Sequence, residues 1–309
     1  WHDLAVIGVA AREAQTEVRC ILRVNPAEPP KAKLAMAGVA SQFGFEQEDF
    51  RAEDRARIEA VSDTVNVCGI HVYYGTQIGD AEALAVCFRS GVETAESVSE
   101  LVGFPLEILN LGGGFPWPYS KAGASDLSEL ADLLKDIYQN AGSAKNATWW
   151  FESGRYLSAS CGKLLTRVMD TKISKGEREF VIVDTGIHHL GGMSGLGRIP
   201  RFAVDCQAFE PRMGDEKTVD VVGQLCTPLD CLARNLKTQP LEAGDLLAIP
   251  NVGAYGATGS LLGFLSRPAP LEIAYRGEEI ASIHQLRTGH QEILTSNLTQ
   301  DLCKQPQAA

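Results

Sequence analysis

The sequence predicts an α/β fold in which a series of strand-helix units is followed by a β-rich domain. Apolar, β-branched runs centred near Leu22, Val67, Ile108 and Trp149 are separated by 45, 41 and 41 residues, with helix-like segments between the later ones. After Arg155 this spacing ends, and shorter runs flank turns in the manner of antiparallel hairpins. The change of pattern predicts two domains.

The strand-helix units predict a parallel sheet. The helix-like segments are residues 81–102 and 127–141, and each lies between two of the apolar runs. Right-handed units in series form either an open sheet or a (β/α)8 barrel, and in both the functional loops lie at the carboxyl ends of the strands. We count only about four units, whereas an eight-stranded barrel needs twice that number.

The second half of the chain predicts antiparallel hairpins. Residues 164–171 and 180–184 flank a lysine-rich turn, and residues 271–275 and 280–286 flank an Arg-Gly-Glu turn. The last residues are mostly polar. We therefore expect a βα part over residues 1–160, a β-rich domain over residues 161–294 and a loosely held tail over residues 295–309.

The composition is that of an ordinary globular protein, with 45% hydrophobic and 22% charged residues. A net charge of -11, from 28 Lys and Arg against 39 Asp and Glu, argues against a nucleic-acid partner. The charge-free stretch 246–266 contains Pro250 and several glycines, so we interpret it as strand plus loop and expect no membrane partner. Eight cysteines without a C-x-x-C pair, and no export signal, favour a cytoplasmic protein with neither disulfides nor a metal site.

Two motifs at strand ends indicate a cofactor site. Gly112-Gly113-Gly114 follows one apolar run, and Glu152-Ser153-Gly154-Arg155 follows the next. Backbone amides of a glycine loop can close on a phosphate, and a guanidinium can pair with it. Taken alone, the glycines could form a tight turn, and Glu152 with Arg155 a surface ion pair. Their common place after buried strands favours the cofactor site.

Three further motifs complete an ordered set. They are the strand end with His71, Tyr73 and Thr76, the loop with Cys226, Thr227 and Asp230, and a loop with Tyr255. Over nearly the whole chain the five motifs resemble the fold-type III pyridoxal-phosphate decarboxylases, the family of ornithine, arginine and diaminopimelate decarboxylases. Four features make the sequence most similar to the branch that acts on carrier-protein-linked glutamyl groups in natural-product pathways. They are Gln42-Phe43-Gly44, His71-Val72-Tyr73, Ser153 in place of the commoner proline, and Cys226-Thr227-Pro228-Leu229-Asp230. The resemblance implies a TIM-type (β/α)8 barrel, a C-terminal antiparallel β domain and pyridoxal 5'-phosphate as cofactor.

The resemblance also implies a role for each cofactor-site residue. Glu152 would face the pyridine nitrogen and favour the protonated ring, the electron sink for the carbanion left by carbon dioxide. Tyr73 stands where better-known members stack a histidine on the ring. His71 either belongs to this site or packs beneath it as a structural residue. The phosphate would be held by Gly112, Gly113, Gly114 and Arg155, with hydroxyl donors from Thr76 and Tyr255, and Ser153 and Gly154 would complete the loop.

A second subunit follows from the same resemblance. Cys226 matches the cysteine that enters the site from the partner and reprotonates the substrate carbon, so we expect a homodimer with shared sites. Asp230 and Thr227 would contact the distal end of the substrate, and Thr227, where diaminopimelate decarboxylases have glutamate, argues against diaminopimelate. Taken alone, Cys226 could be a buried apolar thiol. His188 and His189 are either loop residues or part of the rim of the site.

The family's Schiff-base lysine lies in an A-V-K-A-N-like segment that this sequence does not contain. Lys31 and Lys33 fall in a loop, and Lys121, Lys145 and Lys163 are no better replacements. We therefore expect a carboxyl-terminal part of a longer polypeptide, which a complementary amino-terminal fragment could complete, and poor solubility of the chain alone.

The sequence thus predicts a pyridoxal-phosphate-dependent decarboxylase. It would remove the α-carboxylate of an amino acid, or of an aminoacyl group carried by an acyl carrier protein. One alternative is an amino-acid racemase or epimerase, which reprotonates the same carbanion with the carboxylate retained. Another is a catalytically inactive regulatory homologue, which the missing lysine favours.

Overall fold

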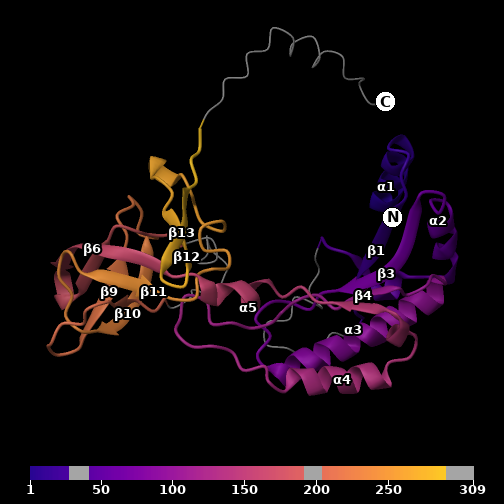
Figure 1. Ribbon diagram of the computed structural model, residues 1–309, viewed down its shortest axis with the longest axis horizontal. Coiled ribbons are helices and arrows are strands. Elements are labelled where there is room, and N and C mark those ends of the chain that lie inside the picture. The colour runs from indigo at the N-terminus through magenta and orange to yellow at the C-terminus, as the bar shows by residue number, and fades with distance from the viewer. Residues whose placement is uncertain (28–41, 191–203, 290–309) are drawn as a thin grey trace, which may run out of the picture.

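The computed structural model describes residues 1–27, 42–190 and 204–289, which form an α/β part and a β part (Figure 1). The expected tail over residues 295–309, Lys31 and Lys33 lie outside the described residues. Figure 1 shows the two parts as separate masses, with α5 at the junction. Each has its own hydrophobic core.

A parallel sheet forms the α/β part. In spatial order its strands are β2 (Phe45–Glu46), β1 (Val18–Asn25), β3 (Val65–Val72), β4 (Ile108–Asn110) and β5 (Thr148–Trp150). The four apolar runs are confirmed as β1, β3, β4 and β5. β2 is additional, because two residues are too few to show a periodic pattern. In the described residues this sheet has five strands, so an eight-stranded barrel stays an expectation.

Helices cover the sheet and connect its strands. Segment 81–102 is confirmed as α3, whose first turn is capped by the Asp80 carboxylate and whose end is Gly103 in the left-handed conformation. Segment 127–141 contains the shorter α4. An amino-terminal helix, α1, was not predicted. The α-helices are α1 (His2–Glu13), α2 (Arg55–Glu59), α3 (Ala81–Val102), α4 (Leu130–Asn140) and α5 (Gly154–Ser158), with 3-10 turns at Gln47–Asp49, Ala52–Asp54, Ser143–Asn146, Ala159–Cys161, Lys175–Glu177 and Phe264–Ser266.

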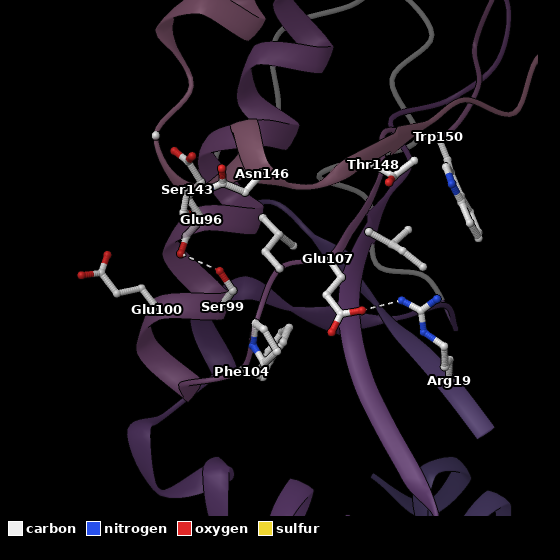
Figure 2. Close-up of a pocket in the computed structure, with 14 residues that line it drawn as sticks. Arg19, Glu96, Ser99, Glu100, Phe104, Glu107, Ser143, Asn146, Thr148 and Trp150 are labelled. Carbon is white, nitrogen blue, oxygen red and sulfur yellow. Dashed lines mark hydrogen bonds and ion pairs between the residues drawn. The ribbon is translucent and has the colours of Figure 1, made fainter. Parts of the chain in front are cut away.

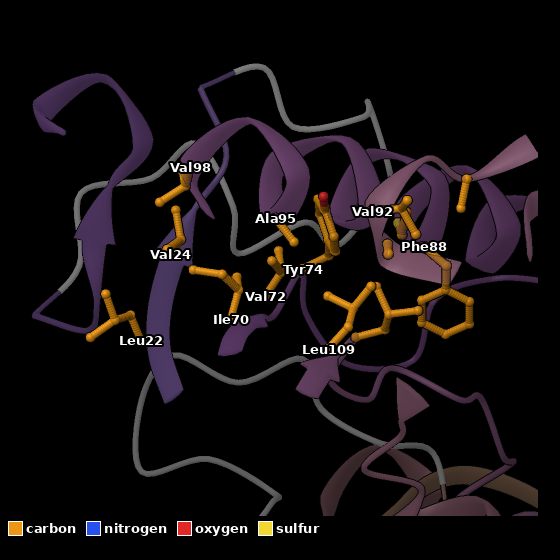
Figure 3. Packing of buried hydrophobic residues seen from close by; sticks show 14 of the residues in the cluster. Leu22, Val24, Ile70, Val72, Tyr74, Phe88, Val92, Ala95, Val98 and Leu109 are labelled. Carbon is orange, nitrogen blue, oxygen red and sulfur yellow. The ribbon is translucent and has the colours of Figure 1, made fainter. Parts of the chain in front are cut away.

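The core of the α/β part lies between the sheet and α3. Figure 3 shows Val24 of β1 and Ile70 and Val72 of β3 beside Ala95 and Val98 of α3, and none of the five is more than 1% exposed. Burying such aliphatic side chains stabilises the fold by about 1.5–3 kcal/mol each. This packing fixes the sheet against α3, and therefore fixes where the loops after β3 and β4 begin.

A six-stranded sheet and a hairpin form the β part. The predicted hairpins are confirmed as β6 with β7 and as β12 with β13. The sheet is not wholly antiparallel, because β7 pairs with β9 in parallel. The sheet order is β10-β9-β7-β6-β11-β8, and the strands are β6 (Leu164–Ile173), β7 (Glu179–Val183), β8 (Gln207–Ala208), β9 (Lys217–Val222), β10 (Cys231–Thr238), β11 (Leu246–Ile249), β12 (Leu271–Arg276) and β13 (Glu279–Gln285).

The charge-free stretch is strand plus loop, as interpreted, because β11 occupies its first four residues. None of the helices in the described ranges combines the length and apolarity needed to cross a membrane. After β11 the chain turns back to the α/β part, where Val252 N donates to Gly162 O at 3.0 Å and Gly253 N to Ala159 O at 2.9 Å. These bonds carry Tyr255 toward the end of β5.

A buried histidine lies in the loop after β7. His188 is 2% exposed, and its ring lies 3.8 Å from that of His189, which bonds to Thr185 Oγ1 and to the Pro268 carbonyl, each at 2.9 Å. Burial, with the nearby charges of His189 and Arg267, lowers the pKa of His188 to about 4. His188 is therefore neutral in the folded protein near pH 7 and packs as a structural group.

This pKa predicts loss of stability in mild acid. The unfolded chain binds a proton at His188 near pH 6.5, whereas the folded chain binds it only near pH 4. The free energy of unfolding should therefore fall as pH drops from about 6.5 to about 4. His188→Gln should flatten this part of the stability profile in urea titrations, while the same change at exposed His284 should leave it unaltered. Equal profiles for wild type and His188→Gln would contradict the prediction.

Candidate active site

Three loops meet at the carboxyl ends of β3, β4 and β5. The loop after β4 lies between the other two, because Glu152 N donates to Gly112 O at 2.8 Å and Ile78 N donates to Gly114 O at 2.9 Å. Backbone hydrogen bonding between neighbouring strands thus continues beyond the strand ends. The motifs on these three loops are brought to one edge of the sheet.

The glycine run is required by this close approach. A Cβ on Gly112 would lie 2.5 Å from Val72 O, and one on Gly113 would lie 2.6 Å from Glu152 O. Gly112 has φ +69° and Gly114 φ +101°, which L-residues rarely adopt. The run therefore lets neighbouring backbone segments pack closely, and Gly113 and Gly114 also line the cavity described next.

A cavity of about 820 Å³ opens at this edge. Every predicted cofactor-site residue except Gly112 lines it, together with four residues that the sequence analysis did not select. The predicted lining residues are His71, Tyr73, Thr76, Gly113, Gly114, Glu152, Ser153, Gly154, Arg155 and Tyr255, and the others are Arg23, Phe115, Phe151 and Leu157.

Glu152 presents a carboxylate to the cavity. The side chain is 49% exposed, and its Oε1 accepts a hydrogen bond from Asn110 Nδ2 at 2.8 Å. His71 Nε2 lies 3.5 Å from the same oxygen but has no hydrogen-bond partner. Burial lowers the pKa of His71, although Glu152 opposes the shift. A neutral His71 leaves the charge of Glu152 available to a cationic group in the cavity.

Arg155, which follows Gly154 at the start of α5, carries a buried positive charge. The residue is 6% exposed, and its Nε and Nη1 atoms are buried without a hydrogen-bond partner. Its guanidinium lies over the rings of Tyr119 and Tyr255, at 5.0 and 5.4 Å from their centroids. No carboxylate of the described residues pairs with it. The surface ion pair considered for Glu152 and Arg155 is therefore absent, and a phosphate-like anion fits this site.

Tyr73 and Arg23 form a wall of the cavity. The Arg23 guanidinium lies 5.4 Å from the centroid of the Tyr73 ring. Burial raises the pKa of Tyr73, so its hydroxyl is protonated near neutral pH. A planar ligand could stack on this aromatic ring.

Cys226, Thr227 and Asp230 do not line the cavity of their own chain. Cys226 is exposed, so the buried-thiol alternative does not describe it. Asp230 is 3% exposed, and its carboxylate accepts backbone hydrogen bonds from Ile187 N at 2.9 Å and Leu225 N at 2.8 Å. Burial raises the pKa of Asp230 despite these bonds. Here the residue joins two loops, and its contact with substrate stays a prediction.

Asn110 and Arg23 are the polar site residues that the sequence analysis missed. Asn110 ends β4, two residues before Gly112, and Arg23 lies near the end of β1. Both positions follow the rule that strand ends carry the site, which could have identified them. Neither residue type is specific enough to stand out from the sequence alone.

A larger cavity, of about 1010 Å³, lies at the opposite, amino-terminal ends of the strands (Figure 2). Its acidic side chains include Glu96, Glu100 and Glu107, and Glu107 already pairs with Arg19 at 2.6 Å. None of the predicted site residues reaches it. Across the described ranges, no group of three His, Cys, Asp or Glu side chains is arranged to hold a metal ion.

Comparison with known proteins identifies the family. A family model described as "Pyridoxal-dependent decarboxylase, C-terminal sheet domain" matches residues 33–253. The L-glutamyl-(BtrI acyl-carrier protein) decarboxylase of Niallia circulans is 32% identical over 97% of this chain, and the diaminopimelate decarboxylase of Archaeoglobus fulgidus is 31% identical over 89%. The chain spans 71% and 65% of the lengths of these relatives.

Solved structures agree with this assignment. A crystal structure of a mutant diaminopimelate decarboxylase from Helicobacter pylori, complexed with L-lysine, has a TM-score of 0.75 and 25% sequence identity. The match covers 92% of this chain and 67% of that chain. The resemblance inferred from the five motifs is therefore confirmed: the chain belongs to the family of pyridoxal-dependent decarboxylases that includes the ornithine, diaminopimelate and arginine decarboxylases.

Proposed function

We propose that this protein acts in the pyridoxal-phosphate-dependent decarboxylation of an amino acid or of an aminoacyl group on a carrier protein. The observation that carries the proposal is that one cavity contains both a buried Arg155 without a hydrogen-bond partner at two of its nitrogen atoms and the Glu152 carboxylate, which is held by Asn110. The first suits the cofactor phosphate and the second its protonated ring nitrogen. Bound pyridoxal phosphate supplies an electron sink for the carbanion that forms when carbon dioxide leaves.

The residues of this chain bind and orient that cofactor. Arg155 pairs with the phosphate, and Thr76 and Tyr255, which also line the cavity, add hydroxyl donors. Glu152 keeps a proton at the ring nitrogen by its negative charge, and a neutral His71 beside it does not neutralise that charge. Tyr73 offers an aromatic face to the ring and, with a raised pKa, does not act as a base near neutral pH.

The substrate proposal rests on the relatives. The Niallia circulans relative is named for an L-glutamyl group on an acyl carrier protein, whereas several others are named for diaminopimelate. Thr227 in place of the glutamate expected for diaminopimelate favours the carrier-linked class. An amino group next to the departing carboxylate is common to both classes.

Decarboxylation can be tested with the protein in its native form, together with any chain that accompanies it. Carboxyl-labelled glutamate, ornithine, diaminopimelate and glutamyl-carrier protein should be supplied with pyridoxal phosphate, and at least one should release labelled carbon dioxide. Glu152→Gln should lower the rate by about a hundredfold or more, because a neutral ring is a poorer sink. Glu107→Gln, an equivalent change at the opposite end of the sheet, should leave the rate unchanged.

Two outcomes would reject the function. The first is cofactor binding without carbon dioxide release from any of these substrates, as expected of an inactive homologue. The second is exchange of the α-proton in heavy water with the carboxylate retained, as expected of a racemase or epimerase.

We also propose that the lysine that carries the cofactor lies outside the described residues of this chain. No lysine lines the cavity within the described ranges. Borohydride reduction of the cofactor-loaded native protein, followed by peptide mass spectrometry, should place the adduct on a lysine elsewhere in the native assembly. An adduct on any of the described lysines would contradict this expectation.

We further propose a larger assembly around this chain. The coverage of relatives and of the solved structure supports an eight-stranded barrel to which β1–β5 contribute. We place the boundary between the two parts near residue 160, between β5 and β6, whereas the expected boundary near residue 294 lies outside the described residues. The cysteines in the described ranges are free thiols, which supports a reducing, cytoplasmic location. A homodimer is supported by the exposure of Cys226 outside its own cavity.

Shared sites predict complementation between variants. In the homodimer, Cys226 of one subunit would donate a proton to the substrate carbon in the partner's cavity. Cys226→Ala should lower product formation by about 10²–10⁴-fold, the range for loss of a general acid. Arg155→Met should lower it by weakening cofactor binding. When the two variants are mixed and allowed to re-associate, about half of the dimers contain one subunit of each kind. In such a dimer one site combines the normal Arg155 of one subunit with the normal Cys226 of the other, so the mixture should regain up to about a quarter of wild-type activity. No recovery in verified mixed dimers would contradict shared sites.

A further inference from the structure

Asn110 connects the two ends of the proposed cofactor site. This residue ends β4, is 6% exposed and uses both polar atoms of its side chain. Its Nδ2 donates to Glu152 Oε1 at 2.8 Å, and its Oδ1 accepts from Gly112 N at 2.9 Å. One rigid amide therefore holds the carboxylate that faces the ring nitrogen and the first glycine of the phosphate loop.

The orientation of this amide is fixed by its neighbours. If the amide were reversed, its oxygen would face the Glu152 carboxylate and its NH₂ group would face the Gly112 N–H. Both contacts would be repulsive, since a carboxylate only accepts and a backbone N–H only donates. The amide side chain of Asn110 satisfies both partners from a single short side chain, and aspartate would lack the donor.

Glu152 needs this support because its side chain is not held by an ion pair with lysine or arginine in the described part of the chain. Half of it is exposed, and its other close polar neighbour, His71, does not form a hydrogen bond with it. A glutamate has three rotatable bonds, and freezing them costs free energy. The bond from Asn110 occupies Oε1, which leaves Oε2 for a ligand.

We propose that Asn110 is a positioning residue that directs Glu152 toward the ring nitrogen of pyridoxal phosphate and couples that contact to the phosphate loop. The inference rests on the proposed function, because it assigns the role of Asn110 relative to this cofactor. If this is correct, changing Asn110 should weaken the binding of a ligand that has the ring nitrogen more than the binding of a ligand that lacks it. A residue that only stabilised the loop would affect all cofactor-like ligands equally.

The test compares two ligands and a matched control. Asn110→Asp keeps an acceptor for Gly112 N–H but replaces the donor to Glu152 with a second carboxylate. Asn25→Asp makes the same change at the end of β1, where the Asn25 amide donates to the Glu46 carboxylate at 2.9 Å and lies outside the cavity. Dissociation constants would be measured with the native protein for pyridoxal phosphate and for its 1-deaza analogue, in which carbon replaces the ring nitrogen.

Asn110→Asp should weaken binding of pyridoxal phosphate by about tenfold to a hundredfold, the usual range for a lost hydrogen bond to a charged group. It should weaken binding of the analogue by less than about threefold, since the analogue makes no contact that depends on Glu152. Asn25→Asp should change neither constant. The effect of Asn110→Asp should also shrink in a Glu152→Gln background, because the two residues act through one contact.

Equal loss of affinity for both ligands, or no loss for either, would overturn the role of Asn110 while leaving the proposed function intact. Failure of the wild-type protein to bind pyridoxal phosphate would instead count against the proposed function. If Asn110→Asp does not fold, Asn110→Ala adds no charge and provides the same comparison. If neither folds, the Asn110 side-chain amide signals in ¹⁵N NMR spectra of wild type must shift more with pyridoxal phosphate than with the analogue, and equal shifts would overturn the inference.

Discussion

The close approach of three backbone segments at Gly112 and Gly113 is the constraint on which the site depends. The carbonyls of Val72 and Glu152 occupy the space where side chains at these positions would begin. Any side chain there would push the loops after β3 and β5 apart. The glycines thus do more than permit an unusual backbone: they set the distance between the strand ends, and with it the distance between the residues that follow β3 and the Glu152 loop that follows β5.

Arg155 imposes the second constraint, because the protein provides little to offset its burial. Desolvating an ion costs several kcal/mol even after relaxation. The two tyrosine rings beside the guanidinium contribute on the order of 0.5–2 kcal/mol each, and two of its nitrogen atoms have no partner. The balance is unfavourable until an anion pairs with the guanidinium. A site of this kind loses stability when empty and regains it on binding, which links cofactor affinity to folding.

How far the sequence predicts the structure depends on the range of the interactions. Segment 81–102 is predicted to the residue because Asp80 and Gly103 mark its ends locally, and the hairpins are predicted because their turns are local too. The two-residue β2 is not predicted, since only its pairing with β1 defines it. Asp230 shows the same limit: its motif suggests a substrate contact, whereas its burial between two loops depends on residues 43 positions away. Asn110 was missed because its role requires Glu152, which lies in the loop after β5.

The cavity is shared between the two parts of the chain, and this explains why neither part would form it alone. The α/β part supplies Glu152 and Arg155, while Tyr255 comes from the loop that the backbone bonds of Val252 and Gly253 hold against the α5 region. Tyr255 has φ +60°, an unfavourable backbone for tyrosine that this docking must maintain. The β part also carries Cys226, yet on a loop that does not reach the same cavity. The β part thus contributes Tyr255 to the cavity of its own chain and presents Cys226 outward, which is the arrangement that the proposed homodimer with shared sites requires.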